Sequence, residues 1–211
     1  MRDDSSSALS PLVALWEWRR QIAELYAEIR ASDAPAEAWR VWRRTRDDLF
    51  RYHAQSPLQP AQRAAFAGLA YFAYDARLRF LVELEATGDA GIESMTAGTD
   101  GTIMLQPMAR THGLAPVLGG ELTLYWIGGY GGGVFLPFRD ATSGKTSYAG
   151  GRYLLDTIKG ADLGWIGGRV VLDFNFAYNP SCAYSHRWVC PLPPPGNTLP
   201  GAVAAGERLA P

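Results

Sequence analysis

A change of hydrophobic period near Tyr74 is the feature that most constrains how this chain folds. Up to that point, apolar residues recur at the three- and four-residue spacing of amphipathic helices. Beyond it, short segments alternate apolar and polar residues as half-buried strands do, with no helical segment between them. The pattern predicts an α+β protein in which N-terminal helices precede an antiparallel β-barrel or strongly curled β-sheet. It argues against a doubly wound parallel sheet.

The helical part is expected to contain three helices. The first lies within residues 11–33, has Ser10 as its N-cap and ends at a break at Ser32. The second begins near Pro35, which suits the first turn of a helix, with Asp33 as a candidate cap. A short third helix is expected over 60–69. The tryptophans of these helices favour a buried core face over a ligand site, because an apolar helical stripe must be covered.

The β part is expected to contain six to eight short strands. They are predicted at RLRFLVELEA, IESMT, TIMLQPM, ELTLYWIGG, GVFLPF, RYLLDT and RVVLDFNFAY, with a hairpin bend at GTDG (98–101). The proline-rich tail PLPPPGNTLPGAVAAGERL is expected to run as an extended strap. Residues 1–72 and 73–211 are expected to form one integrated unit.

Charge and hydropathy exclude two classes of partner. Twenty Lys and Arg residues face twenty-one Asp and Glu residues, and the net charge is -1, so the basic footprint of a nucleic-acid-binding protein is missing. No apolar run approaches the roughly 18 residues that span a bilayer, so no membrane association is expected. The acidic, polar N-terminus does not resemble a signal peptide, and a cytoplasmic location is expected.

A polar turn follows the segment GVFLPF. Arg139 and Lys145 flank the hydroxyls of Thr142 and Ser143, a set that suits a phosphate or carboxylate. The alternative is a hairpin turn in which Asp140 and Ser143 satisfy local backbone groups while the cations are solvated. The triplet GKT is not a phosphate loop, because the first glycine of that motif is replaced by Arg139.

The segment RVVLDFNFAY is read as a strand with two different faces. Asp173 and Asn175 would share one face, opposite three apolar residues. Inside a barrel mouth such a polar face orients a ligand. On an open sheet it is only the solvated side, and the residues alone do not decide between the two.

Both cysteines lie near the C-terminus, and four interpretations remain open for them. Cys182, His186 and Cys190 supply zinc-type donors, but no fourth ligand is evident. A disulfide between the cysteines is geometrically possible, although a reducing compartment opposes it. Cys182 is also a candidate reactive thiol, activated by a neighbouring cation. Two buried and inert thiols are the remaining interpretation.

Long segments of the chain resemble a known family. The segments are RDDLFRYHAQSPL, FAGLAYFAYDARLRF, FLPFRDATSGKTSYAGGRYLLD, VVLDFNFAYNPSCAY and CPLPPPGNTLPGAVAAGE. Together they are similar to the bacterial and archaeal domain of unknown function 1684 family, from about Trp39 to Glu207. The resemblance implies no established activity. It includes both cysteines but not His186, which disfavours the zinc interpretation.

The leading hypothesis from the sequence is a cytoplasmic small-molecule-binding β-barrel, with enzymatic activity left open. Its pocket would lie between the FRDATSGK turn and the DFNFAYNPSC segment. Cys182 and Asp173 are the candidate catalytic residues, and no metal ligand is assigned. The candidate ligand-binding residues are Arg139, Asp140, Thr142, Ser143, Lys145, Tyr148, Arg152, Asn175, Tyr178 and Asn179.

Two alternatives accompany this hypothesis. The first is a flavoprotein, because the SGK triplet resembles the phosphate-holding turn of FMN-binding split barrels. The second is a structural or interaction protein whose Trp-rich helices form a homodimer.

Overall fold

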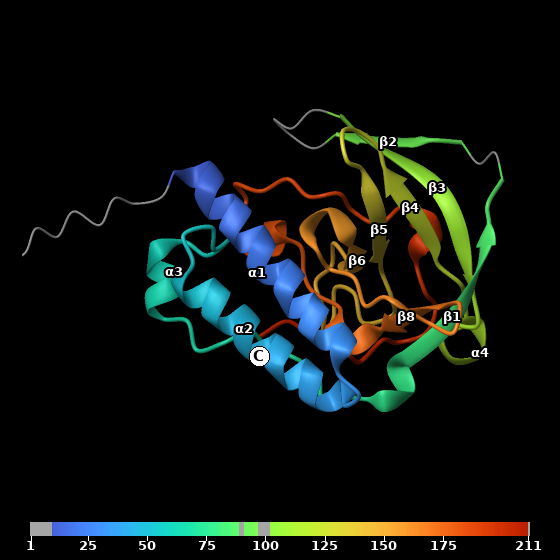
Figure 1. Cartoon of the computed structure of the whole chain (residues 1–211), viewed down its shortest axis with the longest axis horizontal. Helices are drawn as coiled ribbons and strands as arrows, with labels where there is room; N and C mark the ends of the chain where they lie inside the picture. The colour runs from blue at the N-terminus through green and yellow to red at the C-terminus, as the bar shows by residue number, and fades with distance from the viewer. Residues whose placement is uncertain (1–9, 89–90, 97–101, 211) are drawn as a thin grey trace, which may run out of the picture.

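The N-terminal helices form a pair on one flank of the sheet (Figure 1). The computed structural model describes residues 10–88, 91–96 and 102–210. Helix α1 (Pro11–Ala31) begins as predicted, with the Ser10 side chain accepting a hydrogen bond from the Val13 N–H. Helix α2 (Pro35–Tyr52) has Ala34 at its N-cap position and no side-chain cap, so the prediction for Asp33 is wrong.

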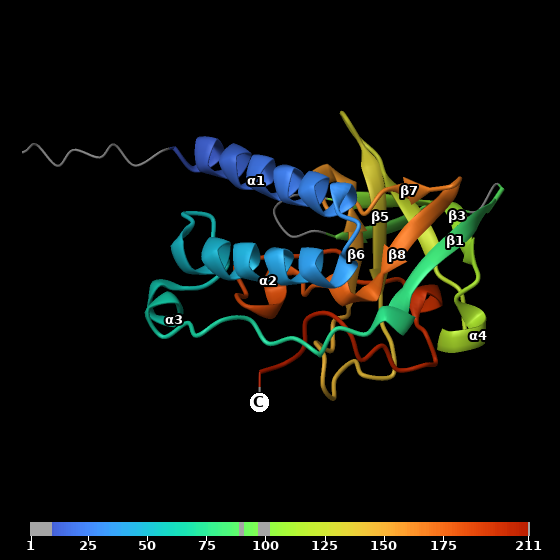
Figure 2. The ribbon, with the colours of Figure 1, turned by 60° about the horizontal axis from the view of Figure 1, so that its bottom comes forward.

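Apolar residues of both helices form a core with the sheet. Trp39 and Trp42 are buried, and the Trp42 ring lies 5.4 Å from the Phe176 ring in an edge-on contact. Val171 and Phe176 of the β part belong to the same cluster as the tryptophans. The tryptophan stripe of α2 is therefore core, as the helical period predicts. Figure 2 shows α1 and α2 side by side against the sheet.

Eight antiparallel strands form one sheet among the described residues. They are β1 (Arg79–Ala86), β2 (Glu93–Thr96), β3 (Thr102–His112), β4 (Thr123–Ile127), β5 (Gly133–Phe138), β6 (Arg152–Asp156), β7 (Trp165–Ile166) and β8 (Arg169–Asp173). The order is β6-β5-β4-β3-β1-β8-β7, with β2 paired to β3. Helix α3 (Pro60–Ala64) and helix α4 (Ala115–Leu118) are single short turns, and α3 is shorter than the predicted 60–69.

Strand β1 makes the sheet curl. Residues 79–82 pair with β8, whereas residues 83–86 pair with β3, so the strand joins two halves of the sheet. At the far edges, Tyr153 of β6 and Tyr178 beyond β8 exchange two backbone hydrogen bonds of 2.9 and 3.0 Å. The structure confirms the predicted α+β fold with N-terminal helices and a strongly curled antiparallel sheet.

One predicted strand is too long. Strand β8 ends at Asp173, and Phe174–Phe176 form a 3₁₀ turn (η4). The Asp173 side chain caps this turn by accepting the Asn175 N–H, and such local capping competes with extension of a strand. Asp173 and Asn175 therefore do not share one strand face. The predicted bend at 98–101 lies outside the described residues.

The C-terminal segment is an extended strap, as predicted. Asn197 fixes it across the sheet: its side chain accepts from the Thr123 N–H and donates to the carbonyls of Thr123 and Pro137. Arg139 exchanges backbone hydrogen bonds with the strap at Asn197 and Leu199. Among the described residues, no helix has both the length and the apolar character needed to cross a membrane.

Candidate functional site

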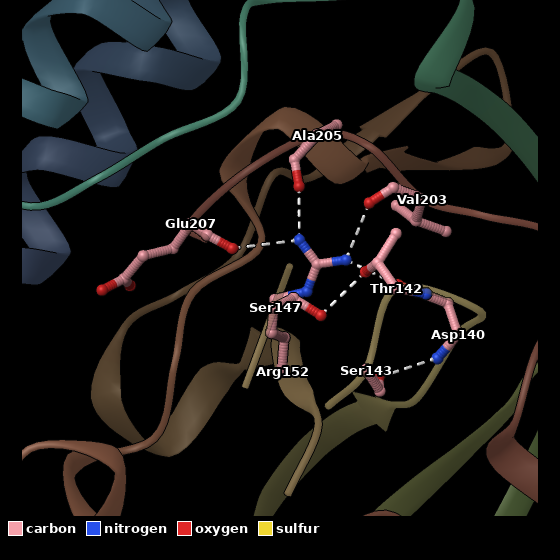
Figure 3. Close-up of polar contacts among 8 residues, drawn as sticks. All are labelled: Asp140, Thr142, Ser143, Ser147, Arg152, Val203, Ala205 and Glu207. Carbon is pink, nitrogen blue, oxygen red and sulfur yellow. Dashed lines mark hydrogen bonds and ion pairs between the residues drawn. The ribbon is translucent and has the colours of Figure 1, made fainter. Parts of the chain in front are cut away.

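Most polar side chains of the FRDATSGK turn are engaged within the protein (Figure 3). The Asp140 carboxylate accepts from the Thr142 N–H and from Nη2 of Arg152, each at 2.5 Å. Ser143 Oγ accepts from the Asp140 N–H at 3.1 Å. The hydroxyls of Thr142 and Ser147 lie 2.7 Å apart. Asp140 and Ser143 thus satisfy local backbone groups, as the hairpin-turn interpretation predicts, but Asp140 also pairs with Arg152, which that interpretation did not include.

Arg152 extends this network to the strap. It is 1% exposed and donates to the carbonyls of Val203, Ala205 and Glu207, as Figure 3 shows. Its ion pair with Asp140 has both side chains buried. A buried charge pair is tolerated only when further hydrogen bonds satisfy it, and the strap carbonyls supply them. Arg152 and Asp140 thus join the turn to the strap, and a ligand role for them stays a prediction.

A second buried ion pair joins α2 to the strap. Glu207 Oε2 accepts from Nη2 of Arg46 and from the Asn179 N–H, both at 2.9 Å. The Arg46 guanidinium lies over the rings of Trp42 and Tyr178, at 4.9 and 5.0 Å from their centroids. Tyr178 and Asn179, predicted as ligand-binding residues, lie beside this ion pair, and a ligand role for them stays a prediction.

Arg139 and Lys145, the two cations of the turn, lie in different surroundings. Nη1 of Arg139 donates to the Pro193 carbonyl at 3.1 Å, whereas the Lys145 side chain is exposed. Ser143 Oγ accepts from the Asp140 N–H, which orients this hydroxyl toward the turn. An anion or flavin site at this turn stays a prediction from the sequence.

Asp173 has a different environment. Its side chain is buried, and Oδ1 accepts from the N–H and the side-chain Nδ2 of Asn175, at 3.0 and 2.7 Å. Oδ2 has no hydrogen-bond partner, and the Nε of Arg79 lies 3.8 Å from it. Asn175 is itself held by the backbone of Asp75 through two hydrogen bonds of 2.8 Å. The carboxyl is therefore fixed through Oδ1, while Oδ2 is buried without a hydrogen bond and has the Arg79 guanidinium as its charged neighbour.

Asp173 is also one of the residues that line a small cavity. The cavity has a volume of about 90 Å³ and lies between the α1–α2 turn and strands β7 and β8. Arg30 and Arg79 provide its positive charge. Its apolar lining comes from Ile29, Pro35, Ala38, Leu163, Trp165, Ile166, Val171 and Phe176. No residue of the FRDATSGK turn lines this cavity, so the expected pairing of the two segments around one pocket is not found there.

Burial shifts the protonation of the carboxyl. It raises the pKa of Asp173 to about 6, against the opposing effects of the Asn175 hydrogen bonds and of Arg79. The same surroundings raise the pKa of Tyr74 to about 12, first through burial and then through the charge of Asp173. A carboxyl with a pKa near neutrality in a cavity is a recognised mark of a functional site.

The remaining predicted residues form a thiol cluster. Cys182 and Cys190 are half-buried and free. The Cys182 N–H donates to Cys190 Sγ at 3.3 Å, and the Tyr148 hydroxyl lies 3.7 Å from Cys182 Sγ. His186 is exposed, and no group of three or more His, Cys, Asp or Glu side chains within the described residues is placed to hold a metal.

Sequence reasoning missed the residues that complete the cavity. Arg79 is paired with Asp173 across β1 and β8, a contact that depends on strand register. Trp165 lies in the two-residue strand β7, which is too short for a periodic signal. Arg30 was an ordinary helix-surface residue in the sequence. The available signal was the pair of glycines at 167 and 168, which predicts a hairpin that would bring Trp165 beside β8.

The fold and the cavity together define a class of protein. It is an α+β protein in which a helical pair flanks a curled antiparallel sheet and a buried aspartate is among the residues that line a cavity between them. A family model described as a protein of unknown function (DUF1684) matches residues 64–208. The chain belongs to this family, which confirms the resemblance found in the sequence.

One solved structure gives an independent comparison. The chain is similar to an uncharacterized protein of Haloarcula marismortui, known from its solution NMR structure, with 34% sequence identity and a TM-score of 0.56. The match covers 84% of this chain and 98% of the archaeal chain. No curated protein matches the chain.

Proposed function

We propose that this protein binds a small molecule in the cavity lined by Asp173. The observation that carries the proposal is Oδ2 of Asp173, which is buried without a hydrogen bond and has only a long ion pair, 3.8 Å, with Arg79. A buried carboxylate oxygen without a hydrogen bond costs stability, and such costs are commonly kept where a ligand supplies the missing partner. The cytoplasmic location expected from the N-terminal residues remains part of the proposal.

The hydrogen bonds around Asp173 support a binding role over a purely structural one. A structural carboxylate uses both oxygens, as the Asp140 carboxylate does with Thr142 and Arg152. At Asp173 both donors come from Asn175 and converge on Oδ1. The arrangement fixes the orientation of Oδ2 before any ligand arrives, which lowers the entropic cost of binding.

The lining defines the ligand by its chemistry. A hydrogen-bond donor, such as an amine, amide or hydroxyl, would meet Oδ2 of Asp173. An apolar or aromatic body would lie against the side chains of the cavity and against Trp165, which is 62% exposed. Because the cavity is only about 90 Å³, it would enclose a few heavy atoms and leave the rest of the ligand near Trp165. A carboxyl with a pKa of about 6 could also exchange a proton with such a ligand.

The proposal is tested with a panel of one-ring amines, amides and alcohols. Binding is measured by ligand-detected NMR above the pKa of Asp173, on the wild type and on Asp173→Asn. We expect binders from the amine group, with the affinity of each reduced by about tenfold or more in Asp173→Asn, because a charged acceptor is lost. Asp48→Asn is the matched control, since Asp48 is exposed on α2 and does not line the cavity.

Two results would contradict the proposal. One is a panel without binders, and the other is a set of binders with equal affinity for the wild type and for Asp173→Asn. The second result would place the binding elsewhere on the protein.

A second proposal concerns assembly. Leu12, Val13 and Trp16 at the start of α1 are 78%, 39% and 69% exposed, which favours the homodimer expected from the Trp-rich helices. Sedimentation velocity over a range of concentrations would show a dimer in the wild type and a monomer in Trp16→Ser. A monomer at all concentrations in the wild type would rule out this assembly.

A further inference from the structure

We propose that Cys182 and Cys190 form a redox-active dithiol in which Cys182 reduces a hydroperoxide and Cys190 then closes a disulfide. This function is separate from ligand binding at Asp173. The proposal rests on the placement of the two sulfurs and of the Tyr148 hydroxyl.

The two cysteines are in direct contact. The Cys182 N–H donates to Cys190 Sγ at 3.3 Å, and the Tyr148 hydroxyl lies 3.7 Å from Cys182 Sγ. Cys182 lies in the 3₁₀ turn Ser181–Ala183 (η5), while Cys190 stands directly before the proline strap. The sulfur of Cys190 therefore lies against the backbone of Cys182, and a resolving thiol is often placed next to the thiol that it resolves in this way.

The loop between the cysteines is anchored at several points. Tyr153 donates its hydroxyl to the Pro191 carbonyl at 2.5 Å, which fixes the chain next to Cys190. Within the loop, Arg187 donates to the Ser56 carbonyl at 3.0 Å. A loop held in this way keeps the sulfurs adjacent, so disulfide formation needs little chain movement.

Two hydrogen-bond donors stabilise the thiolate of Cys182. The Cys190 thiol is the larger influence and the Tyr148 hydroxyl adds to it, while burial opposes both, and the pKa of Cys182 falls to about 6. The pKa of Cys190 is raised by its interaction with the Cys182 side chain and by burial, although the hydrogen bond from the Cys182 N–H and the charge of Lys159 oppose this. The pair thus has distinct roles: Cys182 is the nucleophile and Cys190 keeps its proton.

The proposed chemistry has two steps. In the first, the Cys182 thiolate attacks one oxygen of a hydroperoxide. An S–O bond forms, the O–O bond breaks, and the departing alkoxide takes up a proton to leave as an alcohol or water. In the second, the Cys190 sulfur attacks the resulting sulfenic acid, an S–S bond forms, and the hydroxyl leaves as water with the Cys190 proton. An external dithiol restores both thiols and is itself oxidised to a disulfide.

The first test is intact mass after treatment of the reduced protein with one equivalent of hydrogen peroxide. We expect the wild type to lose two hydrogen atoms and both free thiols. We expect Cys190→Ser to gain one oxygen atom at Cys182, in a form that a sulfenic-acid reagent traps. We expect Cys182→Ser to keep its remaining thiol reduced.

The second test separates the role of Tyr148 from a purely structural one. The rate of Cys182 alkylation is measured against pH, with a midpoint expected near the pKa of about 6. In Tyr148→Phe the midpoint should rise by about one pH unit, because a hydrogen bond to the thiolate is lost. Tyr130→Phe, which alters a fully exposed tyrosine, should leave the midpoint unchanged.

The proposal is overturned if the wild type keeps both thiols after peroxide treatment, an outcome that does not depend on the folding of any variant. It is also overturned if Cys190 is oxidised in Cys182→Ser as fast as the pair is oxidised in the wild type. An alkylation midpoint near the value of an ordinary thiol would equally contradict it.

Discussion

Replacement of Asp173 by asparagine should change how stability depends on pH. The wild-type carboxyl is 1% exposed, and burial raises its pKa from 3.8 to about 6. A shift of this size corresponds to about 3 kcal/mol of free energy between the protonated and charged forms. Asparagine has nearly the same shape and keeps an acceptor for Asn175, but it carries no charge.

The sign of the effect follows from the direction of the shift. Because the native state holds the Asp173 proton more tightly than the unfolded state, the carboxyl stabilises the fold below a pH of about 3.8, and this contribution is lost as the pH rises through about 6. The charged group beside it is Arg79, whose Nε lies 3.8 Å from Oδ2; Tyr74 is also nearby, and Arg30 lines the same cavity. The wild type should therefore lose up to about 3 kcal/mol relative to Asp173→Asn between about pH 4 and about pH 8.

The amide of the variant adds a cost that does not depend on pH. Its N–H groups would occupy the position of Oδ2, where the described residues offer no partner, and an unsatisfied buried donor costs about 1–3 kcal/mol. The net gain of Asp173→Asn at high pH is therefore smaller than the change across the titration. The informative quantity is the change with pH of the stability difference between the two proteins.

The assay is urea unfolding of both proteins across this pH range, with unchanged m-values as the check on the unfolding model. Asp48→Asn provides the background for removal of an exposed carboxylate. A stability difference that stays constant with pH would refute the reasoning. So would a wild type that gains stability relative to Asp173→Asn as the pH rises.

Three further substitutions test the strap and its supports by the free energy of unfolding. Asp140→Ala should cost about 3–5 kcal/mol, because Arg152 would keep a buried charge without its anion; a cost near zero would mean that the strap carbonyls suffice. Gly151→Ala should be more destabilising than Gly167→Ala. Both glycines have positive φ, but only at Gly151 would the added Cβ lie 2.6 Å from a backbone carbonyl, that of Phe138 at the end of β5. Equal costs would argue against this clash. Glu207→Gln should cost about 3 kcal/mol, because Arg46 of α2 would lose its buried anionic partner. A neutral result would show that the ring contacts of Arg46 are enough to hold it.

Hydrophobic period was sufficient to predict the fold class, because helical and strand repeats are properties of neighbouring residues. The predictions of element ends failed where a side chain hydrogen-bonds to the nearby backbone and so overrides the hydrophobic repeat. Strand β8 ends at Asp173 because that side chain caps the turn that follows, whereas the alternation of residues continues to Phe176. Asp33 was expected to cap α2, but Ser32 Oγ accepts the Ala34 N–H instead.

The site could be predicted only in part. Asp173 and Asn175 were identified by their polarity within an apolar segment, but the cavity needs the α1–α2 turn, which is far away in the chain. Asp140 and Arg152 were equally conspicuous in the sequence. Their partners in the strap depend on tertiary folding, so their burial was not visible. From the sequence alone, a segment rich in polar residues therefore could not be assigned to either structural hydrogen bonding or ligand binding.

The most direct test of binding at Asp173 is a two-dimensional NMR titration of the labelled protein with the tightest amine from the probe panel. The account predicts saturable shifts at the Trp165 indole N–H and at the Val171 methyl groups, which line the cavity, and much weaker binding to Asp173→Asn. Shifts that saturate equally in both proteins, or that map outside the cavity, would contradict it.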